Sequence, residues 1–180
     1  MTGTSQKATA LPDWLVTHLN GLDLEGKSGD AIQIMTVDAD GWPHLAQLSV
    51  GEILAVDPQR ILFLTWPAST SSANLIRDGR IVLETVGCGA VWEIRLQARL
   101  LAENRTWQGL KAFSARVMSV TEHRAPYANV LRGLQFELIE PEHTHRRWRE
   151  QINSLKRLAK APPPDNQSAS READSGKPSA

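Results

Sequence analysis

The stretch from Ile61 to Val86 constrains the fold most, because two apolar runs flank a hydroxyl-rich turn and a short segment with mixed polarity. The first run suits a buried strand, and Pro67 then forces a bend. Ser69 is a favourable N-cap, so we expect a short helix after it, and Gly79 ends that helix. The stretch therefore predicts a strand, a turn, a helix and a second strand in succession.

Five hydroxyl groups gather where this helix is expected to begin. They belong to Thr65, Ser69, Thr70, Ser71 and Ser72. The first backbone N–H groups of a helix have no carbonyl partner within it, and the helix dipole favours an anion there. The turn is therefore a candidate phosphate site. A second interpretation stays open, in which Ser and Thr cap the helix and bind no ligand.

Short strands joined by close turns are expected on both sides of this stretch. The sequence predicts a strand over 31–37, a tight turn over 38–41 and a returning strand over 44–50, which is typical of a hairpin. A further strand is expected between 51 and 56. Strict alternation over 91–101 predicts an antiparallel strand covered on one face. The fold class is therefore mainly β with flanking helices, an antiparallel β-barrel.

Three segments have the apolar spacing of amphipathic helices. The first begins near Pro12 and contains Trp14, Leu15, Leu19 and Leu22. The second contains Trp107, Leu110, Phe113 and Val117. The third contains Trp148, Ile152, Leu155 and Ala159. Between the second and the third, residues 133–139 predict a last strand.

The third segment is also basic, because Lys and Arg outnumber the single acidic residue, Glu150, over 143–160. Two interpretations are possible: a nucleic-acid contact, or a docked helix with a solvated basic face. The zero formal net charge of the whole chain favours the docked helix. Residues 161–180 lack large apolar side chains, which predicts a disordered tail after one domain over 11–160.

Several classes of site and partner are disfavoured. Cys88 is the single cysteine, so no internal disulfide forms, and no cationic neighbour in sequence marks it as a reactive thiol. His143 and His145 are two residues apart and would project to different sides of a helix, so no metal site is predicted. No apolar run is long enough to span a bilayer. We therefore expect a cytoplasmic protein without a membrane or nucleic-acid partner.

Several motifs, taken in order, resemble the pyridoxamine 5′-phosphate oxidase-like, FMN-binding split-barrel family. They are the turn from Asp38 to Pro43, the run Phe63-Leu64-Thr65 followed by Ser69, the pair Asn74-Leu75, and the run from Gly79 to Leu83. The match spans about residues 11–140. The resemblance implies a six-stranded split barrel that forms a homodimer, with FMN in the cleft between the two copies.

The resemblance also implies an activity, that of an oxidoreductase in which FMN performs the redox chemistry on a small molecule. The alternative is a module without turnover that binds a flavin, a deazaflavin or haem, or a dimeric scaffold with no cofactor. The sequence names neither a substrate nor a catalytic residue.

By the same resemblance, the FMN phosphate would lie at Ser69, Thr70, Ser71 and Ser72, with Thr65 on the strand beneath it. The flavin ring would lie near Gln47 and Ser49. Trp66 and Asn74 complete the implied FMN-binding set. Pyridoxamine 5′-phosphate oxidases carry Arg-Lys where this chain has Thr70-Ser71. Positive charge at the phosphate would therefore have to come from Arg77, Arg80 or an arginine of a partner subunit.

Overall fold

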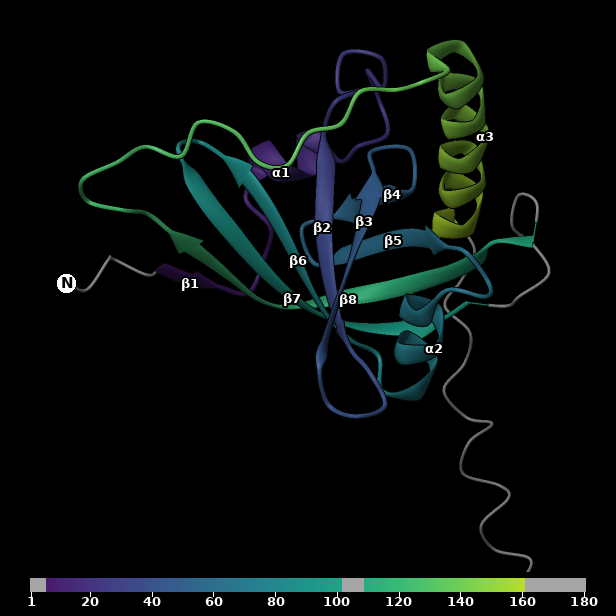
Figure 1. Ribbon diagram of the computed structural model, residues 1–180, viewed down its shortest axis with the longest axis horizontal. Coiled ribbons are helices and arrows are strands. Elements are labelled where there is room, and N and C mark those ends of the chain that lie inside the picture. The colour runs from purple at the N-terminus through teal and green to yellow at the C-terminus, as the bar shows by residue number, and fades with distance from the viewer. Residues whose placement is uncertain (1–5, 102–108, 161–180) are drawn as a thin grey trace, which may run out of the picture.

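The computed structural model describes residues 6–101 and 109–160 (Figure 1). Trp107 and the predicted tail over 161–180 lie outside the described residues. The strands are β1 (Gln6–Ala8), β2 (Ala31–Val37), β3 (Pro43–Ser49), β4 (Ile53–Asp57), β5 (Arg60–Thr65), β6 (Arg80–Gly87), β7 (Ala90–Leu100) and β8 (Lys111–His123). The helices are α1 (Asp13–His18), α2 (Thr70–Arg77) and α3 (Pro141–Lys160). None of the described helices is long and apolar enough to cross a membrane.

The described strands form one antiparallel sheet in the order β3-β2-β6-β7-β8-β5-β4, and β1 pairs with β8. The strands β5 and β8 run across the direction of β2, because the sheet curls into a split barrel (Figure 1). The predicted fold class, mainly β with flanking helices, is confirmed. The sheet has eight strands, whereas the resemblance implied six.

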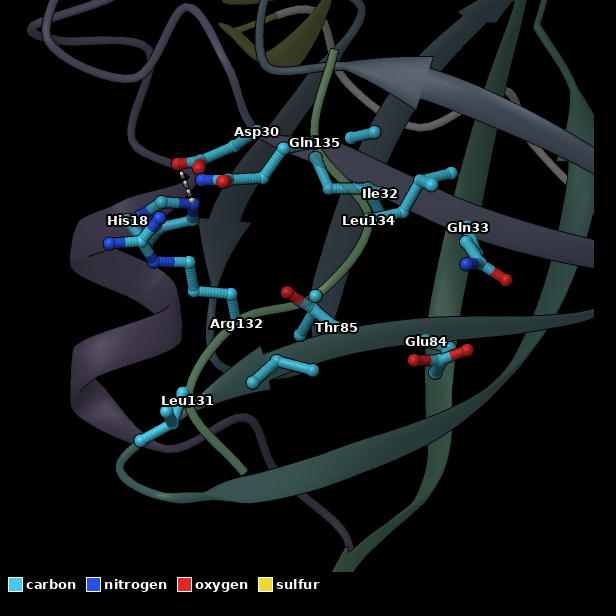
Figure 2. Close-up of a pocket in the computed structure, with 13 residues that line it drawn as sticks. His18, Asp30, Ile32, Gln33, Glu84, Thr85, Leu131, Arg132, Leu134 and Gln135 are labelled. Atoms are coloured by element: carbon cyan, nitrogen blue, oxygen red, sulfur yellow. Dashed lines mark ion pairs between the residues drawn. The ribbon is translucent and has the colours of Figure 1, made fainter. Parts of the chain in front are cut away.

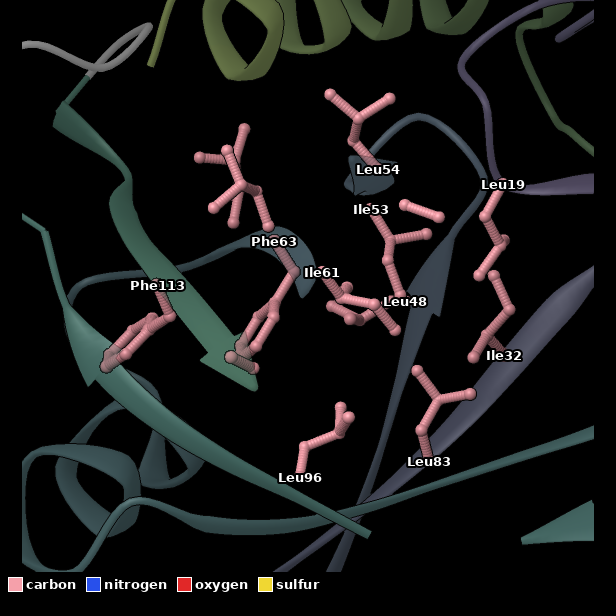
Figure 3. Packing of buried hydrophobic residues seen from close by; sticks show 14 of the residues in the cluster. Leu19, Ile32, Leu48, Ile53, Leu54, Ile61, Phe63, Leu83, Leu96 and Phe113 are labelled. Atoms are coloured by element: carbon pink, nitrogen blue, oxygen red, sulfur yellow. The ribbon is translucent and has the colours of Figure 1, made fainter. Parts of the chain in front are cut away.

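The core fills the inside of the curled sheet. Side chains from opposite sides of the barrel converge there, including Leu48, Ile53, Ile61, Leu83 and Leu96 (Figure 3). Phe63 on β5 and Phe113 on β8 stack with their ring centroids 5.5 Å apart. Because these rings come from paired residues on neighbouring strands, the core also holds the register of β5 against β8.

The helix α3 packs against β4 and β5, at one side of the barrel (Figure 1). Trp148, Ile152 and Leu155 are buried, and Trp148 is only 1% exposed. The carbonyl of Ala159 accepts a hydrogen bond from a guanidinium nitrogen of Arg60 at 3.3 Å, which ties the end of α3 to the start of β5. The predicted docked amphipathic helix is confirmed.

The predicted helix around Leu110, Phe113 and Val117 is wrong, because 111–123 forms the strand β8. This strand lies between β7 and β5, and residues 112–115 are all buried, so both of its faces are covered near its start. A strand covered on both faces loses its alternation, and apolar residues three and four apart then imitate a helix.

Two smaller predictions are also wrong. Residues 133–139 form no strand and contribute one isolated bridge, between Gln135 and Asp30. Their backbone contacts are local: the Ala31 N–H donates to the Leu134 carbonyl at 3.3 Å, and the Phe136 N–H donates to the Gly29 carbonyl at 3.1 Å. Leu22 is exposed and lies beyond α1, which ends at His18. The strand β1 was not predicted, since its sequence is polar and short.

Candidate functional site

The N-terminus of α2 follows directly from the turn after β5, as the sequence predicts. Ser69 is the N-cap, with extended backbone angles, and its Oγ accepts a hydrogen bond from the Ser72 amide at 3.1 Å. This bond satisfies one of the amides that the helix leaves without a carbonyl partner. The predicted cap is therefore confirmed.

Three of the five hydroxyls bond to one another and to the turn. Thr65 Oγ1 lies 2.6 Å from Ser72 Oγ, and Ser72 Oγ donates to the carbonyl of Trp66 at 2.7 Å. Ser69 Oγ donates to the same carbonyl at 2.8 Å. These bonds fix the shape of the turn. The first-turn amides of Thr70 and Ser71 and the exposed side chain of Thr70 are then the groups best placed to meet a ligand.

The remaining predicted residues of the turn and helix have structural contacts of their own. Asn74 is 2% exposed, and its Nδ2 donates to Thr36 Oγ1 at 2.9 Å, which anchors α2 to β2. Ser71 is buried against the barrel. The indole of Trp66 is 53% exposed beside the turn, so it borders the same surface as Thr70.

Gln47 and Ser49 lie on β3, where no described hydrogen bond joins them to the turn. The backbone N–H and the Oγ of Ser49 both donate to Glu52 Oε2 at 2.9 Å. Gln47 is exposed and lies directly opposite Gln33 on β2. The structure thus brings the predicted phosphate residues together and places the predicted ring residues on a separate strand. Their role stays a prediction.

Neither arginine that the sequence analysis offered reaches the start of α2. Arg77 donates to the carbonyl of Val37 and, at 3.1 Å, to Asn74 Oδ1. Arg80 pairs with Asp78 at 2.9 Å. Hydrogen bonds from Arg80, above all from its backbone N–H, hold the pKa of the Asp78 carboxyl below its ordinary value. Both arginines lie at the C-terminal end of α2, where they cannot pair with a phosphate at its N-terminus.

A cation that the sequence analysis missed lies beside the turn. Lys111, the first residue of β8, is directly opposite Thr65 on β5, so both side chains project to the same face of the sheet. Lys111 is half-buried and has no hydrogen-bond or ion-pair partner within the described part of the chain. The sequence analysis missed Lys111 because it predicted a helix in this segment, which forms the strand β8. The β-branched residues Val117, Val120 and Thr121 were the available sign of a strand.

A second concavity lies between α1, the paired strands β2 and β6, and residues 131–135 (Figure 2). Its volume is about 180 Å³, small for a flavin site. His18 Nε2 lies 3.4 Å from Asp30 Oδ2 at one end, and Gln33 and Glu84 lie at the other. Burial lowers the pKa of His18, although the Asp30 carboxylate opposes this shift. The neutral imidazole is therefore favoured in the folded protein.

The fold defines a class, that of the split β-barrels, and solved structures of other proteins share it. A candidate pyridoxamine 5′-phosphate oxidase of Lactobacillus delbrueckii matches 63% of this chain and 94% of its own, with 15% identity and a TM-score of 0.50. A variant of HupZ from Group A Streptococcus matches 62% of this chain and 98% of its own, with 13% identity and a TM-score of 0.50. At these identities the likeness concerns the fold.

Sequence comparison identifies a nearer relative. The uncharacterized protein YclD of Bacillus subtilis (strain 168) is 32% identical over 152 residues, which cover 84% of this chain and 99% of YclD. The chain therefore belongs to the same family as YclD. No protein-family model matches the chain.

Proposed function

We propose that this protein is a flavoprotein that holds the phosphate of FMN at the N-terminus of α2. The observation that carries the proposal is the placement of a Ser69-capped helix N-terminus beside Lys111 in a split barrel. A helix N-terminus favours an anion, and an ammonium group adds a charge-assisted contact. Beyond this end of the helix, Arg77 at its last turn and Arg80 at the start of β6 already have hydrogen-bond or ion-pair partners.

The donor set fits a phosphate group. The amides of Thr70 and Ser71, the Thr70 hydroxyl and the Lys111 ammonium offer both hydrogen-bond donors and positive charge. The bonds among Thr65, Ser69 and Ser72 keep the turn in one shape before the ligand arrives, which lowers the entropy cost of binding. When bound, FMN would supply the redox chemistry, and the protein would supply position and electrostatics.

The proposal includes a homodimer. Three large apolar side chains near the turn and on the β2–β3 hairpin are exposed: Trp66 at 53%, Leu45 at 58% and Trp42 at 71%. Burying such surface against a second copy contributes about 25 cal/mol per Å². We expect sedimentation velocity at micromolar concentration to give a dimer. A monomer at that concentration would oppose this part of the proposal.

Flavin binding is tested by titrating the full chain into FMN and into riboflavin, which lacks the phosphate, and measuring flavin fluorescence. FMN should bind distinctly more tightly than riboflavin. The variant Lys111→Gln should weaken FMN binding about tenfold or more and leave riboflavin binding unchanged, because a hydrogen bond to a charged group is lost. Lys7→Gln, on the exposed strand β1, is the matched control. Equal affinity for the two ligands would remove the phosphate role from the turn.

Turnover is a separate part of the proposal. We expect NAD(P)H to bleach the visible absorbance of the FMN-loaded protein, and an electron acceptor to restore it, if the protein is an oxidoreductase. If NAD(P)H leaves the visible absorbance of the FMN complex unchanged, the result would favour a binding module without turnover. Parallel titrations with a deazaflavin and with haem test the other cofactors, and absence of all binding would favour a scaffold.

A further inference from the structure

The outer face of the sheet carries three arginines at the start of β5 and on the adjoining parts of β8 and β7. Arg60 on β5 lies directly opposite Arg116 on β8, and Arg116 lies opposite Gln97 on β7. Two residues along, Ser114 lies opposite Arg99. Residues two apart on a strand share a face, so Arg60, Arg116 and Arg99 all project to one side.

This arrangement places like charges against one another, and Asp57 is the one acidic side chain among the described residues of the pocket that they line. Like charges directly opposite on neighbouring strands destabilise a sheet, and diagonal neighbours are also within reach of long side chains. Arg99 and Arg116 have no ion-pair or hydrogen-bond partner within the described residues. Arg60 Nε lies 3.7 Å from Asp57 Oδ2, too far for a hydrogen bond, and is buried with no hydrogen-bond partner there.

The three side chains line one pocket of about 630 Å³, together with Asp57, Ser114 and Gln97. This volume lies in the range of small-molecule sites. Three guanidinium groups and one carboxylate leave two net positive charges, and Ser114 adds a hydroxyl. A phosphate group carries nearly two negative charges at neutral pH and suits the planar fork of arginine. We propose that this pocket binds the phosphate group of a small phosphorylated molecule.

The pocket is separate from the proposed FMN site. Arg60 begins β5 and Thr65 ends it, so the two sites lie about 17 Å apart along the strand at 3.3 Å per residue. The two sites also lie on opposite faces of the sheet. The outer face carries Arg60, Arg99 and Arg116. Thr65 and Lys111 lie on the inner face, two residues from the stacked rings of Phe63 and Phe113. The inference therefore stands whether or not the protein binds FMN.

Calorimetric titration of the full chain at low ionic strength tests the proposal, with pyrophosphate, inorganic phosphate and citrate as probes. We expect pyrophosphate to bind most tightly, with a submillimolar dissociation constant. Arg116→Gln and Arg99→Gln should each raise that constant at least about tenfold, because each removes a charge-assisted contact. Arg116→Lys, which keeps the charge and loses the fork, should have a smaller effect. Arg149→Gln on α3, exposed and outside the pocket, is the matched control.

Other results would overturn the proposal. Pyrophosphate binding that is weaker than millimolar, or that Arg149→Gln weakens as much as Arg116→Gln, would show only general charge attraction. Tighter binding of citrate than of pyrophosphate would show that the pocket prefers a polycarboxylate to a phosphate group. The titration is repeated on protein saturated with FMN: unchanged pyrophosphate affinity supports two sites, and mutual displacement would make this pocket the FMN phosphate site. Failure of FMN to bind leaves the pyrophosphate result intact.

Discussion

The indole of Trp148 on α3 lies directly over Gly51, at the turn between β3 and β4. A Cβ on Gly51 would lie 2.0 Å from Trp148 Cγ, much closer than two carbon atoms approach. Trp148 has the largest fully buried side chain among the described residues, and its position requires that residue 51 have no side chain. This contact explains how a helix with a strongly basic exposed face stays docked on the barrel.

Gly51→Ala should destabilise the fold by about 1–3 kcal/mol, because the added methyl group overpacks the site. Trp148→Ala should cost about 3–5 kcal/mol through the lost burial and the cavity left behind. Gly29→Ala is the control, since a Cβ there meets its nearest atom, the carbonyl oxygen of Phe136, at an ordinary 3.5 Å. Urea denaturation measures all three, together with the Gly51→Ala, Trp148→Ala double variant. Additive effects in the double variant would contradict the contact.

The His18 site predicts a pH dependence of stability. Burial lowers the pKa of His18 in the folded protein below the ordinary value of 6.5, although Asp30 opposes and Lys27 reinforces this shift. The unfolded chain therefore binds the proton first as pH falls, so stability is fully present above pH 6.5 and declines below it. Melting temperatures between pH 7.5 and 5.5 should fall less in His18→Gln than in the wild type. His143→Gln, exposed on α3, should follow the wild type.

Buried polar atoms on α3 predict a substitution that stabilises the protein. Both amide atoms of Gln151 are fully buried without a hydrogen-bond partner among the described residues, as is Ser154 Oγ. A buried polar group without a partner costs about 1–3 kcal/mol. Gln151→Met should therefore raise the melting temperature, and Ser154→Ala should leave it unchanged or raise it. A clear fall in both variants would mean that a bound water or ligand satisfies these groups.

Most of the barrel could be predicted from local signals. The hairpin of β2 and β3 and the cap of α2 depend on turn and capping residues such as Gly41 and Ser69, which act within a few residues of themselves. The alternation in β7 survives because its polar row, including Arg95 and Arg99, faces solvent. The amphipathic stripe of α3 is equally local. Such features do not require knowledge of the strand order.

The parts of the fold and of the candidate site that the sequence did not predict depend on which strands become neighbours in the sheet. Ala112 and Phe113 lie on opposite faces of β8 and are both buried, which removes the alternation that identifies a strand, and only the sheet order explains that burial. Lys111 was missed for the same reason, because its position beside Thr65 is a matter of register between distant segments. The arginine pocket likewise combines residues from three strands. Sequence patterns locate elements, but they do not locate sites formed between elements.

In the turn between β5 and α2, we expect substitutions of different hydroxyl residues to have different effects on FMN affinity and on stability. Thr70 is exposed in the first turn of α2, so Thr70→Ala should weaken FMN binding about fivefold, the value of one neutral hydrogen bond. Thr70→Lys should tighten it by adding a charge-assisted contact. Ser69→Ala removes the N-cap, and should lower the stability of the protein by about 1 kcal/mol.

These variants separate binding from capping when FMN affinity and melting temperature are measured on the same samples. Thr70→Ala should change the affinity and leave the melting temperature of the ligand-free protein nearly constant, since its side chain makes no described hydrogen bond. Ser69→Ala should lower that melting temperature. If neither Thr70 variant changes FMN affinity while Ser69→Ala lowers the melting temperature, the hydroxyls of this turn serve the helix alone, and the phosphate must bind elsewhere on the barrel.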